Sequence, residues 1–161
     1  MLFNAMDKWW GNRGKRERPH EGLDLCYYRD REDRIFHLDE KTKIPVLYDG
    51  VVVRVMDDFI GKSVMVEHHL PESRYPLLCT IYGYTNLPHD LNVGKIVKAG
   101  NMIALLARPK KSQKNIPPHL HISGVWIFKN ISYEALDWET MPTLKTLQWI
   151  DPLRLIRRRF L

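Results

Sequence analysis

The sequence has no long apolar run, so it contains no candidate for a membrane-spanning helix. Such a helix needs about 20 consecutive apolar residues, and polar or charged residues interrupt every apolar stretch of this 161-residue chain well before that length. Residues 1–10 also lack the charged-then-apolar pattern of a secretory signal. Two interpretations stay open: the protein is cytoplasmic, or the chain is a fragment whose export segment is missing.

Cysteine is scarce, with Cys26 and Cys79 alone in the chain. Each lies in an apolar run of strand character, where a thiol behaves as a small hydrophobic group. A chain of this length buries a core without disulfide or metal cross-links. We therefore expect two free thiols rather than a disulfide.

Several catalytic motifs are missing. The chain has no His-Glu-x-x-His segment, which excludes the helix-borne zinc protease site. It also has no serine or cysteine nucleophile elbow and no glycine-rich phosphate loop. These absences exclude the commonest serine hydrolase and nucleotide-binding sites.

Basic residues exceed acidic ones, giving a formal net charge of +6. They gather at residues 13–18, 108–114 and 154–159. A basic surface favours anionic partners such as nucleic acid, anionic lipid or an anionic wall polymer. A solvated surface without a partner explains any one of these clusters equally well.

Short β-branched and apolar runs, separated by turn residues, predict an all-β domain of antiparallel strands. Asp49-Gly50 is a hairpin turn signal, and Gly61, Gly94 and Gly100 mark further turns. We expect strands at 23–28, 44–47, 51–56, 63–68, 77–84, 102–107 and 119–128, with a further short strand around Ile35 and Phe36.

One domain accounts for the whole chain, 1–161. Residues 1–19 are dense in arginine and glycine and predict an irregular N-terminal segment, while 129–161 form a mixed C-terminal extension. In that extension we expect a helical turn within 133–138 and pairing or capping by 143–150. Asp151-Pro152 is interpreted as a stop, followed by a short basic tail.

Two histidine motifs carry the clearest chemical signal. The first is His20-Glu-Gly-Leu-Asp24, and the second is Pro118-His119-Leu-His121. Together they offer imidazoles and a carboxylate, the ligand types of a catalytic zinc site with three protein ligands. A single histidine is more often an ordinary surface or core residue, but two such motifs in one short β-rich chain favour a metal site.

The spacing limits how these residues could meet. On a strand, His119 and His121 point to one side at roughly 6–7 Å, which suits one ligand plus one neighbouring acid or base. In an extended chain His20 and Asp24 would lie roughly 13 Å apart, so a turn must bring them together. Gly22, between them, is a residue type that permits such a turn.

With these motifs in view, residues 9–156 resemble the lysostaphin-type (LytM-domain) zinc metallopeptidases, which cut peptide cross-links of bacterial cell walls. His20 to Asp24 matches the family's His-x-Gly-x-Asp motif, and Pro118 to His121 matches its His-x-His motif. The segments 44–53, 61–68, 93–103 and 150–153 resemble the family's strands, turns and closing Asp-Pro-Leu, in the same order.

The resemblance implies a LytM-like, duplicated-hybrid-motif-type β-sandwich with a groove that holds Zn²⁺. His20, Asp24 and His121 would hold the metal, and His119 would be the catalytic histidine beside it. Zinc in such a site lowers the pKa of water and polarises the scissile carbonyl. The substrate would be a peptidoglycan peptide, and the residues do not distinguish a D-Ala–diaminopimelate bond from a glycyl bridge.

Two departures from the family pattern concern catalysis. Where relatives carry a second catalytic histidine, this chain has Tyr84, whose phenol could donate a hydrogen bond but is a poor base at neutral pH. His89 would replace that histidine only if its loop folded back. The loop 108–116, rich in glycine in relatives, is basic here, and the resemblance implies that it borders the groove.

Three functional hypotheses follow. The first is a zinc-dependent endopeptidase with a His₂Asp site, acting on peptidoglycan in the periplasm or outside the cell. The alternative is a non-catalytic LytM-like zinc-binding module that binds cell wall or a protein partner. A nucleic-acid-binding β-barrel, suggested by the charge and by Trp9, Trp10, Tyr27 and Tyr28, is disfavoured because it leaves the histidine motifs unexplained.

Overall fold

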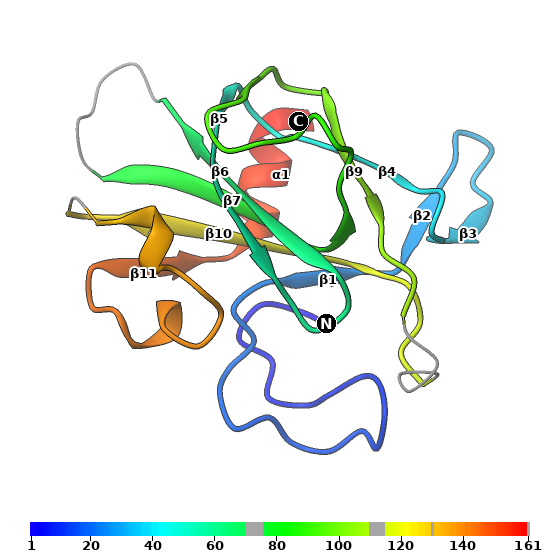
Figure 1. The fold of residues 1–161 in the computed structure, drawn as a ribbon. Helices are drawn as coiled ribbons and strands as arrows, with labels where there is room; N and C mark the ends of the chain where they lie inside the picture. Colours follow the sequence, from blue (N-terminus) through cyan, green and yellow to red (C-terminus); the bar gives the residue numbers. More distant parts are fainter. Residues whose placement is uncertain (70–75, 110–114, 130, 161) are drawn as a thin grey trace.

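The computed structural model describes residues 1–69, 76–109, 115–129 and 131–160. Within these residues, nine strands form one sheet in which every pairing is antiparallel, which confirms the all-β prediction (Figure 1). These strands are β1 (Leu23–Leu25), β4 (Lys43–Pro45), β5 (Gly50–Asp57), β6 (Lys62–His68), β7 (Leu77–Asn86), β8 (Ile96–Val97), β9 (Met102–Leu106), β10 (Leu120–Ile127) and β11 (Leu147–Ile150).

The centre of the sheet is built by alternation. On β6, Val64 and Val66 pack into one hydrophobic core, while Met65 between them packs into a second core. Successive side chains of a strand point to opposite faces, so the sheet is buried on both sides. The central strands, in the order β10-β7-β6-β5, are therefore packed on both faces and fix the positions of the side chains that they carry.

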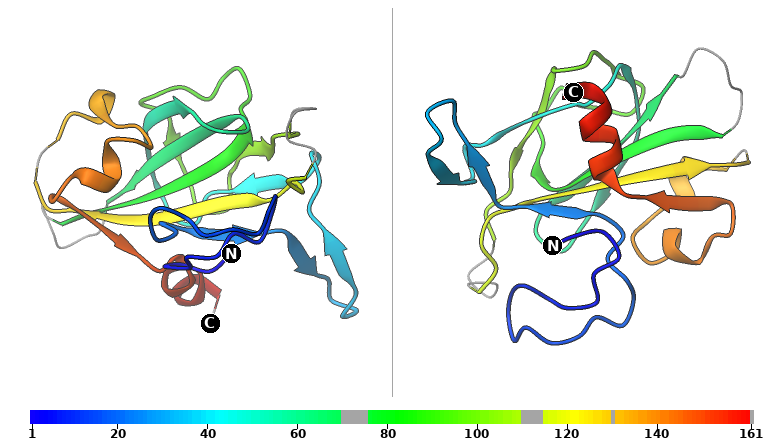
Figure 2. Two further views of the ribbon diagram at one scale, coloured as in Figure 1. Left: turned by 90° about the horizontal axis from the view of Figure 1, so that it is seen from below. Right: turned by 180° about the vertical axis from the view of Figure 1, so that it is seen from behind.

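A separate hairpin departs from the prediction. The strand expected over 23–28 is two strands, because the chain leaves the main sheet after Leu25 and β2 (Tyr27–Arg29) pairs with β3 (Ile35–His37) instead. The short strand expected around Ile35 and Phe36 is present as β3. Figure 2 shows this hairpin projecting from the side of the sheet.

The C-terminal extension adds structure that the sequence interpretation missed in part. Short 3₁₀ turns, η2 (Tyr133–Ala135) and η3 (Met141–Thr143), precede β11, which pairs with β10. The expected stop at Asp151-Pro152 is instead a helix start, since the Asp151 Oδ1 accepts a hydrogen bond from the Leu153 N–H at 3.0 Å. Acidic caps and a first-turn proline both favour helix initiation, and α1 runs over Pro152–Phe160.

The N-terminal segment 1–19 lies against β1. The Asn4 N–H donates to the His20 carbonyl at 2.8 Å, and the His20 N–H donates to the Ala5 carbonyl at 3.0 Å. Figures 1 and 2 show the segment as a loop beside β1 and β10. It is thus held by backbone bonds next to the first histidine motif.

Cys26 and Cys79 are free thiols, as expected. Burial raises the pKa of the Cys79 thiol to about 12, so this thiol is un-ionised at neutral pH. In the part of the chain that the structure describes, no helix is long and apolar enough to cross a membrane.

Candidate metal centre

The strand register places two of the predicted ligand residues side by side. Asp24 on β1 lies opposite His121 on β10, which lies opposite Gly83 on β7. Directly opposed residues of antiparallel strands share one face of the sheet, with Cβ atoms about 4.5–5.5 Å apart. Residues 97 positions apart in the sequence therefore meet because of strand pairing.

His20 reaches the same point through a bend at Gly22, just before β1. A Cβ atom at Gly22 would lie 2.5 Å from the Ile122 carbonyl oxygen and 2.7 Å from Cε1 of His121. The glycine is therefore needed for this close approach to β10, whereas its φ lies outside the left-handed region, so the bend itself does not require glycine.

Three side-chain atoms converge in the buried centre. The His20 Nε2 lies 3.1 Å from the His121 Nδ1 and 3.2 Å from the Asp24 Oδ1, and the His121 Nδ1 lies 3.0 Å from the same oxygen. All three residues are buried. This is the His-Asp-His group that could hold a metal ion among the described residues.

The three atoms have too few hydrogens to satisfy one another. The His20 Nδ1 lies 3.0 Å from the Leu2 carbonyl, which can only accept, so a neutral His20 has its lone pair on Nε2. The carboxylate of Asp24 also can only accept. Neutral histidines therefore supply at most one hydrogen, on the His121 Nδ1, for three converging atoms, and a cation or an added proton would relieve their repulsion.

The geometry fits zinc. Atoms bound at about 2.1 Å to a tetrahedral ion lie about 3.4 Å apart, and the three separations here are 3.0 to 3.2 Å. Two imidazoles and a carboxylate are also a ligand set that zinc accepts, with a fourth position left for water. The ligand role of these residues stays a prediction that this geometry supports.

The electrostatics of Asp24 agree with a charged carboxylate. Burial by itself would raise the pKa of Asp24, but hydrogen bonds from His121 and His20, together with the charge that these histidines carry when protonated, outweigh it and hold the pKa well below its usual range. Asp24 is therefore ionised at all ordinary pH values and carries the negative charge that a divalent cation requires.

Further hydrogen bonds orient the converging groups. The His121 Nε2 lies 2.9 Å from the Ser123 hydroxyl, and the Trp9 indole N–H donates to the Asp24 Oδ2 at 2.7 Å. The sequence interpretation did not include Ser123 and used Trp9 only for the nucleic-acid hypothesis. The position of Ser123 beside His121 could be predicted from the sequence, since residues 121 and 123 of a strand share one face.

His119 lies beside the group and outside it. It precedes the first residue of β10, and its Nε2 is 3.9 Å from the Asp24 Oδ1. Its Nδ1 lies 2.8 Å from the Pro117 carbonyl, so in the neutral ring Nε2 keeps the lone pair. Burial lowers the pKa of His119, and the charge of Asp24 and the Pro117 bond only partly oppose this, which favours the neutral form.

Tyr84 reaches the site because of a β-bulge. Lys62 pairs with Thr85 and Val64 pairs with Tyr82, so Ser63 alone faces both Gly83 and Tyr84. Tyr84 has a φ of 63°, in the left-handed region. Alternation alone would place Tyr84 on the face of Tyr82, whereas a bulge re-aims a side chain, and the Tyr84 ring lies 4.9 Å from the His119 ring and 5.5 Å from the His121 ring.

Asp58 holds this bulge in place. Its Oδ2 accepts hydrogen bonds from the Tyr84 N–H and from the Ser63 hydroxyl, each at 2.7 Å. A bulge leaves a backbone group without a ladder partner, and here the carboxylate supplies one. Burial, with the nearby charges of Asp24 and Asp58, raises the pKa of the Tyr84 phenol well above its usual value, so Tyr84 stays protonated.

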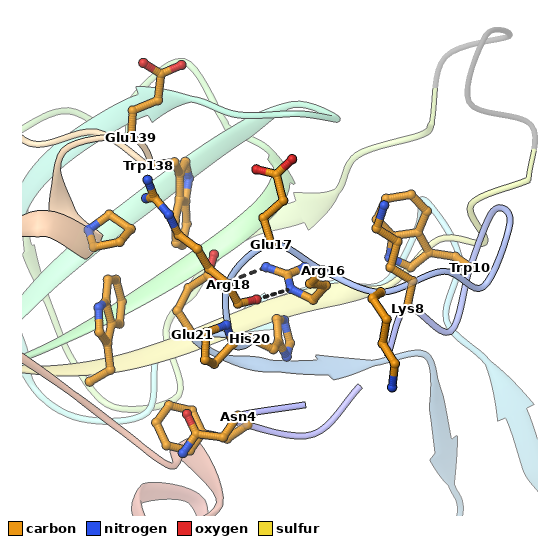
Figure 3. A pocket seen from close by; sticks show the side chains of 15 residues that line it. Asn4, Lys8, Trp10, Arg16, Glu17, Arg18, His20, Glu21, Trp138 and Glu139 are labelled. Atoms are coloured by element: carbon orange, nitrogen blue, oxygen red, sulfur yellow. Dashed lines mark hydrogen bonds and ion pairs between the residues drawn. The ribbon is translucent and has the colours of Figure 1, made fainter. Parts of the chain in front are cut away.

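Two cavities adjoin the centre. One of about 970 Å³ includes His20, and Figure 3 shows it between Trp138 and Trp10 with Arg16 and Arg18 in its lining. The other, of about 450 Å³, includes His121 and Tyr84, and its charged residues are Glu21, Asp57, Asp58, Asp137 and Glu139. Glu21, Trp138 and Glu139 line both cavities.

Two further predictions concern the surroundings of the site. His89 is exposed and lines neither cavity, so its loop does not fold back onto the centre. Residues 110–114 of the basic loop 108–116 lie outside the described residues. The proposed role of that loop as a border of the groove stays a prediction.

The fold was compared with known proteins. No protein-family model and no curated protein matches the sequence. Among solved structures, that of LytU has a TM-score of 0.58 at 18% identity and covers 98% of this chain and 83% of its own. The solution structure of lysostaphin has a TM-score of 0.58 at 15% identity and covers 97% of this chain.

The chain has the lysostaphin-type fold. A second lysostaphin structure, of the antimicrobial peptidase from Staphylococcus simulans, matches with a TM-score of 0.52 at 17% identity over 88% of this chain. The chain spans 50% and 45% of the two lysostaphin chains, about half of each. At these identities the lysostaphin-type likeness establishes the fold, and the function is argued from the site.

Proposed function

We propose that this protein is a zinc-dependent endopeptidase that hydrolyses peptide cross-links of peptidoglycan. The observation that carries the proposal is the convergence of His20 Nε2, Asp24 Oδ1 and His121 Nδ1 at 3.0 to 3.2 Å with at most one hydrogen among them. Three protein ligands of imidazole and carboxylate type, with a position left for water, are the composition of a catalytic zinc site. His20, Asp24 and His121 would hold the zinc, whose Lewis acidity activates water and polarises a carbonyl.

His119 is suited to move protons. With Nδ1 bonded to the Pro117 carbonyl, its Nε2 faces the centre with a free lone pair. A neutral imidazole in this position accepts a proton from the attacking water and returns it to the leaving amine. Because burial lowers the pKa of His119, its ring is neutral before the reaction.

Tyr84 supplies a hydrogen-bond donor in place of a histidine. Because its pKa is raised, the phenol keeps its proton and cannot act as the base. A fixed donor that points at a developing oxyanion stabilises the transition state without reorganisation. Tyr84 lines the cavity beside His121, where the substrate carbonyl would lie.

The substrate and the compartment are parts of the same proposal. The paired cavities with tryptophan walls fit an extended peptide that passes over the centre. The carboxylates of the smaller cavity favour a positively charged group of the substrate on the His121 side. Action on peptidoglycan would place the protein in the periplasm or outside the cell.

The direct test is hydrolysis of purified cell-wall fragments, with zinc and with a chelator. We expect cleavage that the chelator abolishes, and that His119→Ala abolishes at unchanged zinc content. His89→Ala is the matched control, because His89 is exposed and away from both cavities. Absence of chelator-sensitive cleavage in protein shown to contain zinc would rule out the enzyme.

A non-catalytic zinc-binding module, which binds cell wall or a protein partner, is the second candidate. The observation in its favour is Tyr84, which packs against His119 and His121 where a second proton-transferring histidine is expected. Under this alternative Tyr84→His creates activity in an inactive protein. Wild-type cleavage equal to that of the variant would exclude it.

A further inference from the structure

The carboxylate of Asp24 has two oxygens with different surroundings. Oδ1 lies 3.0 Å from the His121 Nδ1 and 3.2 Å from the His20 Nε2, whereas Oδ2 accepts the Trp9 indole N–H at 2.7 Å. We infer that Trp9 is a positioning residue of the metal centre, which holds Asp24 so that Oδ1 alone faces the metal. This inference rests on the proposed zinc site.

The bond has one direction only. An indole N–H can only donate and an ionised carboxylate can only accept, so no alternative protonation reverses it. Rotation of the Asp24 carboxylate would break a short, charge-assisted hydrogen bond. The indole therefore removes the freedom of Asp24 to offer Oδ2, or both oxygens, to an ion.

Trp9 is itself held in the correct place. Its ring and the His119 ring form a T-shaped pair with a centroid distance of 5.1 Å and an interplanar angle of 85°. Two contacts close the loop that carries Trp9. The Lys8 N–H donates to the Gly14 carbonyl at 2.9 Å, and Asp7 forms a β-bridge with Lys15. One side chain thus links the N-terminal segment to a ligand and to the catalytic histidine.

The neighbouring Trp10 provides a matched control. Its ring stacks on Phe59 at 6.2 Å, with the Lys8 ammonium 5.7 Å from the ring centroid. Trp10 lines the larger cavity, and its ring contacts within the described part of the chain are with Phe59 and Lys8, neither of which is a proposed ligand. Replacing either tryptophan by phenylalanine keeps an aromatic ring in the segment, but only Trp9→Phe removes the donor to Asp24.

The test is a zinc titration of wild type, Trp9→Phe and Trp10→Phe, each in competition with a chromophoric chelator. Loss of an outer hydrogen-bond partner of a ligand weakens metal binding about 10–100-fold, and we expect this for Trp9→Phe with Trp10→Phe unchanged. Equal affinity of Trp9→Phe and wild type overturns the inference and leaves the zinc site intact. Equal weakening of both variants overturns it too, and absence of zinc binding by wild type overturns it together with the proposed function.

A second measurement does not depend on the variant folding. The five tryptophans give separate indole N–H signals in the NMR spectrum of the ¹⁵N-labelled wild type. We expect zinc to shift the Trp9 indole signal more than that of Trp10, because the acceptor of its hydrogen bond becomes a ligand. An unshifted Trp9 signal in zinc-saturated protein contradicts the inference.

Discussion

His68 and His121 are both buried side chains of the central sheet, on β6 and β10, but their hydrogen-bond partners differ. The His68 Nδ1 lies 3.0 Å from the Asp49 carbonyl and its Nε2 lies 2.8 Å from the Thr80 hydroxyl. The Tyr82 hydroxyl lies 3.1 Å from that of Thr80 and accepts the Leu47 N–H at 2.8 Å.

In the His68 cluster the hydroxyl protons can be ordered so that every donor meets an acceptor. In the His121 cluster, His20 Nε2, Asp24 Oδ1 and His121 Nδ1 converge with at most one hydrogen. Buried polar groups are normally satisfied, so the His68 cluster needs no further group, whereas the shortage of protons in the His121 cluster supports the proposed cation site.

The largest expected difference is in zinc affinity. His121→Ala would remove a proposed ligand atom and should weaken zinc binding more than about 100-fold, beyond the cost of losing an outer hydrogen-bond partner. His68→Ala should bind zinc as wild type does, because its partners belong to the other cluster. Chelator competition measures both, and equal affinities of His121→Ala and wild type would contradict the comparison.

Catalysis should depend on Tyr84, whose ring packs against His119 and His121. Tyr84→Phe removes the phenolic donor, and loss of one oxyanion donor costs about 100-fold or more in kcat. Zinc affinity should not change, since Tyr84 contacts the histidines only through its ring. Steady-state kinetics on a cell-wall peptide gives the ratio, and an unchanged kcat would remove Tyr84 from the mechanism.

Stability of the metal-free protein should depend on both histidines. His68→Ala removes the hydrogen-bond partner that faces the Asp49 carbonyl, while the Thr80 hydroxyl keeps that of Tyr82, and loss of a buried hydrogen-bond partner costs about 1–3 kcal/mol. His121→Ala should cost at least as much, because it removes a hydrogen-bond partner of the buried, ionised Asp24. Urea unfolding in chelator measures both variants, and wild-type stability of either variant would contradict the expectation for that residue.

The smallest expected effect is a pH dependence of unfolding. Burial lowers the pKa of His68, outweighing the opposing effects of the Asp49 carbonyl and Glu67. Unfolded histidine titrates near 6.5, so the unfolded state binds the proton first as pH falls. The contribution of His68 is full above about pH 6.5 and declines below it, by about 1.4 kcal/mol per unit of pKa difference.

His68→Gln tests this directly. The unfolding free energy of wild type and variant is compared between pH 7.5 and pH 5.5, in metal-free protein. We expect a shallower loss in the variant, and identical slopes would show that His68 is not held neutral by the fold.

The resemblance of the two histidine motifs to the lysostaphin type implied the set His20, Asp24 and His121, whereas spacing and strand alternation alone left open which of His119 and His121 would be a ligand. The sequence could not predict the bulge at Gly83-Tyr84, because a bulge depends on the pairing register between β6 and β7. Trp9 lies in a segment without periodicity and meets Asp24 by a single tertiary bond. The start of α1 was readable from Asp151 and Pro152 as an acidic cap followed by a first-turn proline.

The central claim is that the proton-short cluster binds one zinc ion. The most direct test is anomalous scattering at the zinc absorption edge from crystals grown with zinc. We expect one strong peak about 2.1 Å from each of His20 Nε2, Asp24 Oδ1 and His121 Nδ1, and none at His68. A zinc-saturated crystal without that peak, or with zinc bound only elsewhere, would contradict the account.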